Sequence, residues 1–288
     1  MKLLSFRRNG EDGIGALTDD TVVDLTASTQ CRDLGAALRK HGAKGLLDIA
    51  RQGCGPTFAL AQVESFRPAV ADSARILCVG LNYEEHRVEA GRNRTAHPTI
   101  FLRLPSSQTG HECPIVVPAE LPEGLDFEGE IAIIIGRGGR RIPAVQAWSH
   151  VFGYAPYNDA SARAWQAHST QWTAGKNFPH TGAFGPWITS SDELGDNPLL
   201  TLTTRLNGDV MQHADTGMML FPIPELIAYA STFTTLEPGD VIVTGTPGGV
   251  GFKRNPPVLM RDGDVVEIEV SGVGTLRNVV RKEIVTVT

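Results

Sequence analysis

The chain of 288 residues is long enough to bury a sizeable core, as one large domain or as a large domain with a small companion. Its 41% hydrophobic and 20% charged residues are ordinary for a globular protein, and a net charge of −6 without a long run of like charges excludes nucleic acids and anionic membranes as expected partners.

The N-terminus has no apolar signal core, and no stretch approaches the roughly 18 apolar residues that cross a bilayer. The four cysteines are widely spaced, without a pattern typical of zinc sites. We therefore expect a soluble, cytoplasmic protein with reduced thiols and no membrane partner.

Residues 1–70 are predicted to form a small α+β domain. Turn sequences separate short strand candidates, and periodic leucines predict a helix over residues 32–51. Glycine and proline then indicate a linker at 53–68. The strand candidates are residues 3–6, 15–17 and 21–25. The second predicted domain covers residues 71–288.

From residue 75 onward, short apolar segments alternate with glycine and proline. The strand candidates are residues 76–79, 99–102, 115–117, 131–135, 200–206, 241–244, 265–270 and 276–280. The helix candidates are residues 84–90, 161–168 and 224–235. This density of strands predicts a mainly β fold of the α+β class.

Glu128 and Glu130 stand at the head of the apolar run 131–135. Side chains alternate along a strand, so both glutamates point to the same face of a segment that is otherwise buried. They need a counterion, and hard carboxylate ligands favour Mg²⁺, Mn²⁺ or Ca²⁺ over zinc, with Asp159 as a third ligand. The alternatives are a solvent-exposed glutamate pair and an Asp159 that caps the helix expected near Ser161. We favour the metal site, because the run lacks the polar alternation of a half-exposed strand.

Several other polar residues could take part in chemistry. His86 and Glu89 lie three apart on a predicted helix, so the carboxylate can orient the imidazole to activate water. Lys176, in a loop rich in glycine and aromatic residues, can stabilise an oxyanion or enolate near a metal. Arg163 and Gln166 can hold a substrate carboxylate or carbonyl. Taken alone, each of these patterns is more typical of a protein surface than of a functional site.

The segment 244–251 is a glycine-rich loop after a strand. It lacks the ending of a phosphate-binding loop and the spacing of a dinucleotide fingerprint. We interpret it as a close backbone approach to a ligand, with Thr246 supplying a hydroxyl. His111 is interpreted as a structural histidine.

In this order the segments resemble the fumarylacetoacetate hydrolase superfamily over residues 75–286, with the N-terminal module often seen in bacterial members. The matching segments are 78–89, 101–107, 126–136, 153–163, 175–178 and 244–251.

The resemblance implies a mixed β-sandwich roll, usually a homodimer, that binds a small 2-oxo acid. It implies Mg²⁺ or Mn²⁺ held by Glu128, Glu130 and Asp159, and a mobile lid that carries His86 and Glu89. The residues expected to contact substrate are Lys176, Arg163, Gln166, Thr246, Tyr83 and Arg103. Two departures bear on the substrate: Ala164 stands where the family often has Asp, and Arg103 where Lys is frequent.

The main hypothesis is hydrolysis of a carbon–carbon bond in a 2,4-dioxo acid, such as an acylpyruvate or a diketo sugar acid. The metal would chelate the 2-oxo acid, His86 oriented by Glu89 would activate water, and Lys176 would stabilise the pyruvate enolate. The alternatives are decarboxylation of an oxaloacetate-type acid, and hydration or isomerisation of a 2-oxo-alkenoate. A binding protein without activity is disfavoured, because all of these residues are present.

Overall fold

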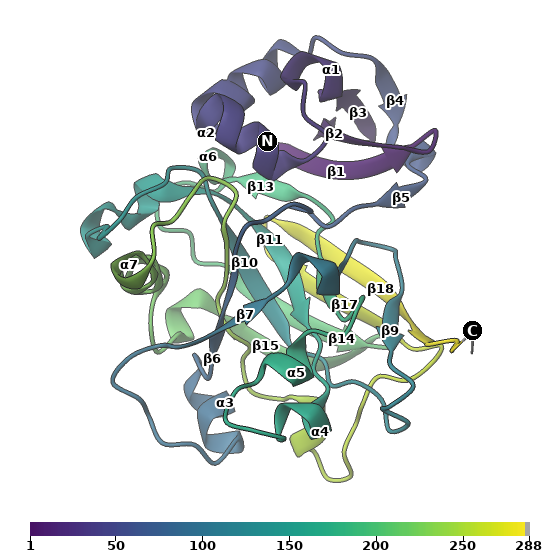
Figure 1. Ribbon diagram of the computed structural model, residues 1–288, viewed down its shortest axis with the longest axis vertical. Coiled ribbons are helices and arrows are strands. Elements are labelled where there is room, and N and C mark those ends of the chain that lie inside the picture. Colours follow the sequence, from purple (N-terminus) through teal and green to yellow (C-terminus); the bar gives the residue numbers. More distant parts are fainter. Residues whose placement is uncertain (286–288) are drawn as a thin grey trace.

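The computed structural model describes residues 1–285, so residues 286–288 of the predicted second domain, and with them the last residue of the segment that resembles the family, lie outside the described part. Figure 1 shows the N-terminal segment, in purple, above a body rich in strands. None of the helices in residues 1–285 is long and apolar enough to cross a membrane.

The N-terminal segment contains strands and one long helix. Its elements are β1 (Lys2–Arg8), β2 (Glu11–Thr18), β3 (Thr21–Asp24), α1 (Thr26–Thr29), α2 (Leu34–Gln52), β4 (Thr57–Ala59) and β5 (Ser65–Phe66). The side chain of Asp33 caps α2 by accepting from Ala36 N. Gly42, at a φ of 67°, kinks α2. The predicted strands and helix of this segment are therefore present; β1 and β2 are longer than expected, whereas β3 ends one residue earlier.

The first sheet runs in the order β4-β3-β2-β1-β13-β11-β10-β16-β6-β7, with β5, β8 and β12 paired beside it. The strands not yet given are β6 (Ile76–Gly80), β7 (Thr99–Arg103), β8 (Gln108–Thr109), β10 (Gly129–Ile135), β11 (Val151–Asp159), β12 (Gly182–Phe184), β13 (Ile188–Ser190) and β16 (Val241–Val243). The N-terminal strands join the rest of the sheet through β1 and β13, where Lys2 pairs with Thr189. One continuous sheet therefore links the two parts of the chain.

The second sheet has the order β15-β14-β17-β18-β9 and packs against the first. Its strands are β9 (Ile115–Val117), β14 (Thr201–Leu206), β15 (Asp209–Asp215), β17 (Val265–Val270) and β18 (Gly274–Lys282). Ile131 and Ile133 of β10 share a core with Ile268 of β17, whereas Ala132 and Ile134 face the core that includes α2. Burial on both faces explains the unbroken apolar run of β10. The mixed, sheet-rich α+β fold is confirmed.

The remaining helices are short, apart from α7. They are α3 (Glu84–Glu89), α4 (Arg163–Gln166), α5 (Thr173–Lys176), α6 (Ser191–Leu194) and α7 (Ile223–Phe233). The 3-10 helices are Leu60–Gln62, Pro105–Ser107, Ala144–His150, Thr216–Met218 and Gly251–Lys253. The helix expected over residues 161–168 is shorter than predicted, because Ser161 still forms a β-bridge with Asp126.

Candidate active site

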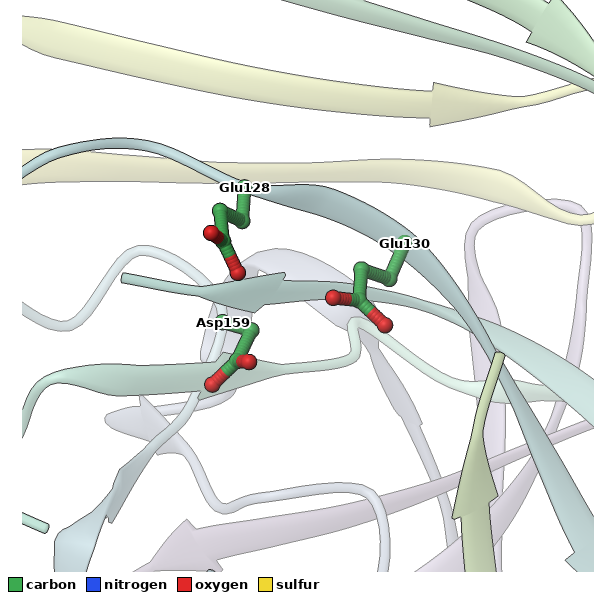
Figure 2. A group of neighbouring side chains, drawn as sticks. All are labelled: Glu128, Glu130 and Asp159. Carbon is green, nitrogen blue, oxygen red and sulfur yellow. The ribbon is translucent and has the colours of Figure 1, made fainter. Parts of the chain in front are cut away.

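Three carboxylates converge where β10 and β11 pair. Glu128 precedes β10, Glu130 lies within it, and Asp159 is the last residue of β11. The backbone amide of Asp159 donates to the Glu128 carbonyl at 2.9 Å. One oxygen of each carboxylate lies within 4.8 Å of the others, and Figure 2 shows all three groups directed toward the same space. None is more than 4% exposed, so the alternative of a solvent-exposed glutamate pair is wrong.

Basic side chains surround this cluster unevenly. Lys176 Nζ lies 2.6 Å from Glu128 Oε2 and 2.6 Å from Asp159 Oδ2. Arg163 Nη2 lies 2.6 Å from Glu128 Oε1, and Arg103 Nη1 lies 2.5 Å from Asp159 Oδ1. Glu130 instead accepts the Gly245 amide at 2.6 Å and has no ion-pair partner among residues 1–285. Negative charge therefore remains unbalanced at Glu130.

The pKa values follow this distribution of charge. Burial opposes the charge of Glu128, but Arg163 and Lys176 hold the pKa of Glu128 well below its ordinary value. Burial and the charges of Asp159 and Glu128 raise the pKa of Glu130 well above its ordinary value. Hard oxygen donors with one uncompensated charge fit a divalent cation such as Mg²⁺ or Mn²⁺.

His86 and Glu89, both on α3, lie beside the cluster. Nδ1 of His86 is 3.4 Å from Glu89 Oε2, and the same oxygen accepts the Gly249 amide at 3.3 Å. Asn82 fixes the start of this segment, since its Nδ2 donates to the Thr244 carbonyl at 2.8 Å. His86 is only 6% exposed, so the alternative of a pair on an exposed helix surface is wrong.

A cavity of about 960 Å³ opens over the carboxylates. Of the predicted residues, its wall includes Glu128, Glu130, Asp159, His86, Lys176, Arg163, Gln166 and Thr246. Phe101, Trp172 and Phe252 make part of the wall apolar, and Arg92 and Lys253 add positive charge. The cavity can therefore hold an anionic ligand with an apolar portion.

Two residues expected to contact substrate lie outside the cavity wall. The Arg103 side chain has no exposed surface, and it donates to Asp159 and, at 2.6 Å, to Thr181 Oγ1. Tyr83 is 2% exposed. Neither residue therefore lines the cavity in this structure, and Arg103 supports Asp159 from behind. Ala164, the other departure, is exposed and also lies outside the wall.

Asp126 belongs to the site, although no role was predicted for it from the sequence. It is fully buried, accepts the Gly251 amide at 2.7 Å, and accepts Arg163 Nε at 2.8 Å. Asp126 thus ties the glycine-rich loop to the arginine that contacts Glu128. The available signal was its spacing of two residues from Glu128, which places both on one face of an extended segment.

Residues 75–281 match the family described as "Fumarylacetoacetate (FAA) hydrolase C-terminal". The chain belongs to the fumarylacetoacetate hydrolase family. Oxaloacetate tautomerase YisK of Bacillus subtilis is 38% identical over 223 residues, which cover 77% of this chain and 74% of that protein.

Solved structures of this family resemble nearly the whole chain. The fumarylacetoacetate hydrolase of Exiguobacterium antarcticum is 33% identical with a TM-score of 0.84, over 98% of this chain and 100% of that one. A maleylpyruvate hydrolase of Sphingobium sp. SYK-6, in complex with manganese(II) and pyruvate, is 31% identical with a TM-score of 0.80, over 99% and 100%. Other similar structures are named as isomerases. The chain is therefore an enzyme of a family that includes hydrolases, isomerases and oxaloacetate tautomerases.

Proposed function

We propose that this enzyme is a divalent-metal-dependent tautomerase of oxaloacetate-type 2-oxo acids, which moves a proton between C3 and the 2-oxygen. The observation that carries the proposal is His86, the one imidazole that residues 1–285 contribute to the cavity wall, placed beside a buried carboxylate cluster. Tautomerisation requires one proton-transfer group and nearby positive charge, and it consumes no water. The similarity to an oxaloacetate tautomerase supports this choice over the hydrolysis favoured by the sequence.

Glu128, Glu130 and Asp159 are the residues that would hold the cation. When bound there, a Mg²⁺ or Mn²⁺ ion supplies Lewis-acid polarisation to a 2-oxo acid. Lys176 and Arg163, each within 2.6 Å of Glu128, place two further positive charges beside the same space. These charges stabilise the negative charge that develops on the substrate oxygen.

His86 is the proposed proton carrier. A carboxylate can only accept, so the contact with Glu89 keeps the hydrogen of the neutral ring on Nδ1 and leaves Nε2 free to accept a proton. His86 takes the proton from C3 and returns it to the enolate oxygen. Glu89 stabilises the imidazolium that exists between these two transfers.

The cavity wall also favours a dicarboxylic acid over a monocarboxylic one. Arg92 and Lys253 are exposed basic side chains of the wall, outside the carboxylate cluster. They supply positive charge that is not already paired with the buried carboxylates. A second substrate carboxylate, as in oxaloacetate, is the complementary group.

Hydrolysis of an acylpyruvate remains the second candidate. The same His86 and Glu89 can activate a water molecule, and the similar maleylpyruvate hydrolase is named for such a reaction. The two functions differ in the bond that changes, because hydrolysis releases pyruvate whereas tautomerisation leaves the carbon skeleton intact.

The deciding experiment follows enol absorbance of oxaloacetate with enzyme stripped by EDTA and then reloaded with Mg²⁺ or Mn²⁺. Pyruvate release from acylpyruvate, maleylpyruvate and oxaloacetate is measured in parallel. We expect the metal-loaded enzyme to remove enol absorbance faster than the metal ion does without enzyme. This rate should also exceed the rate of pyruvate release from any of the three substrates. Pyruvate release from acylpyruvate with tautomerisation at the rate of metal alone would reject the proposal in favour of the hydrolase.

A further inference from the structure

A buried glutamine from the second sheet reaches the site. Gln212 on β15 is 1% exposed. Its Oε1 accepts the Gly129 amide at 3.0 Å, and its Nε2 donates to Thr246 Oγ1 at 2.7 Å and to the Pro247 carbonyl at 3.0 Å. Gly129 separates Glu128 from Glu130, so the amide of Gln212 bridges the carboxylate strand and the glycine-rich loop.

Two backbone groups determine which atom of the Gln212 side-chain amide is the oxygen and which is the nitrogen. The Gly129 amide can only donate, so the atom facing it must be the oxygen. The Pro247 carbonyl can only accept, so the atom facing it must be the nitrogen. The orientation of this side chain is therefore dictated by its fixed neighbours.

This orientation also fixes the polarity of Thr246. Both Nε2 hydrogens of Gln212 are directed at acceptors, so Thr246 Oγ1 must accept one of them. The single hydroxyl hydrogen of Thr246 is then donated to the Gly129 carbonyl at 3.0 Å. Since a hydroxyl oxygen has two lone pairs, one remains for the cavity that Thr246 lines.

We propose that Gln212 is a positioning residue that holds Thr246 as a hydrogen-bond acceptor toward the cavity. The ligand group that Thr246 meets must then carry a hydrogen, as the hydroxyl of an enol or a water molecule does. The enol of an oxaloacetate-type acid is the donor expected here, and to that extent the inference rests on the proposed function.

A double-mutant cycle tests whether Gln212 acts through Thr246. The variants are Q212M, T246V and their combination. Their kcat is measured for whichever reaction the wild-type enzyme catalyses, so that a failure of the proposed function can be distinguished from a failure of this inference. We expect each single variant to lower kcat about tenfold, the equivalent of one lost hydrogen bond. The kcat of the combined variant should be no lower than that of the less active single variant. Losses that multiply in the combined variant would overturn the proposal.

The matched control is T204V. Thr204 lies opposite Gln212 in the β14–β15 pair and is also buried, and its hydroxyl has no hydrogen-bond partner in the described part of the chain. We expect kcat of T204V to stay within about twofold of wild type, because no hydrogen bond is removed. A loss as large as that of Q212M would show a general packing effect and overturn the proposal.

Q212E provides a test that does not depend on tolerance of Q212M. An ionised carboxylate cannot donate to Thr246, whereas a protonated carboxyl can donate to Thr246 and still accept from Gly129. The kcat of Q212E relative to wild type should therefore rise as pH falls, with thermal unfolding used to check that both proteins stay folded. A ratio independent of pH would contradict the assigned role, since a structural defect alone does not respond in this way.

Discussion

Arg103 Nη1 donates to Asp159 Oδ1 at 2.5 Å, and neither side chain has exposed surface. Breaking a buried ion pair leaves one charge without a partner, which costs more than the loss of an exposed pair. The site therefore depends on a residue that its ligand cannot reach.

We expect R103M to lower the free energy of unfolding by about 3–5 kcal/mol. R103K keeps the charge but loses the donors to Thr181 and to the Ala160 carbonyl, so its loss should be about 1–2 kcal/mol. Urea denaturation measures both. R277M, which removes an exposed pair with Glu112, is the control and should cost under about 1 kcal/mol. Equal effects of R103M and R277M would contradict this prediction.

E130Q should abolish turnover and weaken metal binding. It removes the carboxylate that has no basic partner, so the metal-free variant should be at least as stable as metal-free wild type. Thermal unfolding with and without Mn²⁺ checks this, because a ligand that binds only the folded state raises Tm. The exposed change E123Q should leave the Mn²⁺-induced rise intact. An unaltered rise in E130Q would exclude Glu130 as a ligand.

H86A should lower kcat for tautomerisation about 10²- to 10⁴-fold, the usual contribution of a positioned acid–base group. Hydrolysis of acylpyruvate should fall with it, because the attacking water needs a base, whereas oxaloacetate decarboxylation should be affected much less. H97A is a suitable control, since His97 is exposed and stacks on Tyr229. Equal losses in all three reactions would argue against a proton-transfer role.

His111 should make the protein less stable in acid. Burial lowers the pKa of His111 from 6.5 to about 4. Between these values the unfolded chain binds a proton that the folded chain does not, so stability is full above pH 6.5 and is lost as pH falls toward 4. The loss amounts to up to about 3 kcal/mol. In H111N the side-chain oxygen can replace Nδ1 as acceptor for the Arg277 amide, so urea denaturation should show a smaller decline over this range.

G129A should destabilise the protein and disturb both neighbouring glutamates. A Cβ on Gly129 would lie 2.0 Å from Thr204 Oγ1, closer than any real contact. T204A removes that oxygen, so the double variant G129A/T204A should recover part of the lost stability. Chemical denaturation of the three variants tests this, and a double variant no more stable than G129A would show that another contact limits the site.

The alternation of Glu128 and Glu130 before an apolar run was sufficient to predict where the carboxylates gather, because strand geometry alone puts both on one face. The β-rich fold and its family were likewise predictable from the order of the segments. Strand β11, which carries Asp159, was missed because Gly153 and Pro156 are unfavourable inside a strand. The homodimer and the cytoplasmic location stay predictions.

Long-range contacts set the limits of prediction for the site. The position of Gln212 in the sequence forms no motif with the other site residues. Its role depends on the fold, which places β15 across from Gly129. Arg103 was assigned to the cavity from its position in a motif, but burial places it behind Asp159. The junction between β1 and β13 pairs Lys2 with Thr189, which are far apart in the sequence, and no local pattern reveals such a pairing.

That junction has a consequence for any shortened form of the chain. Without residues 1–66, the backbone amides and carbonyls of β13 that now pair with β1 would have no hydrogen-bond partners in that strand. An exposed strand edge of this kind can pair with strands of other chains. We therefore expect the N-terminal segment to protect this strand edge from aggregation, and its removal to lower solubility even where the site residues are unchanged.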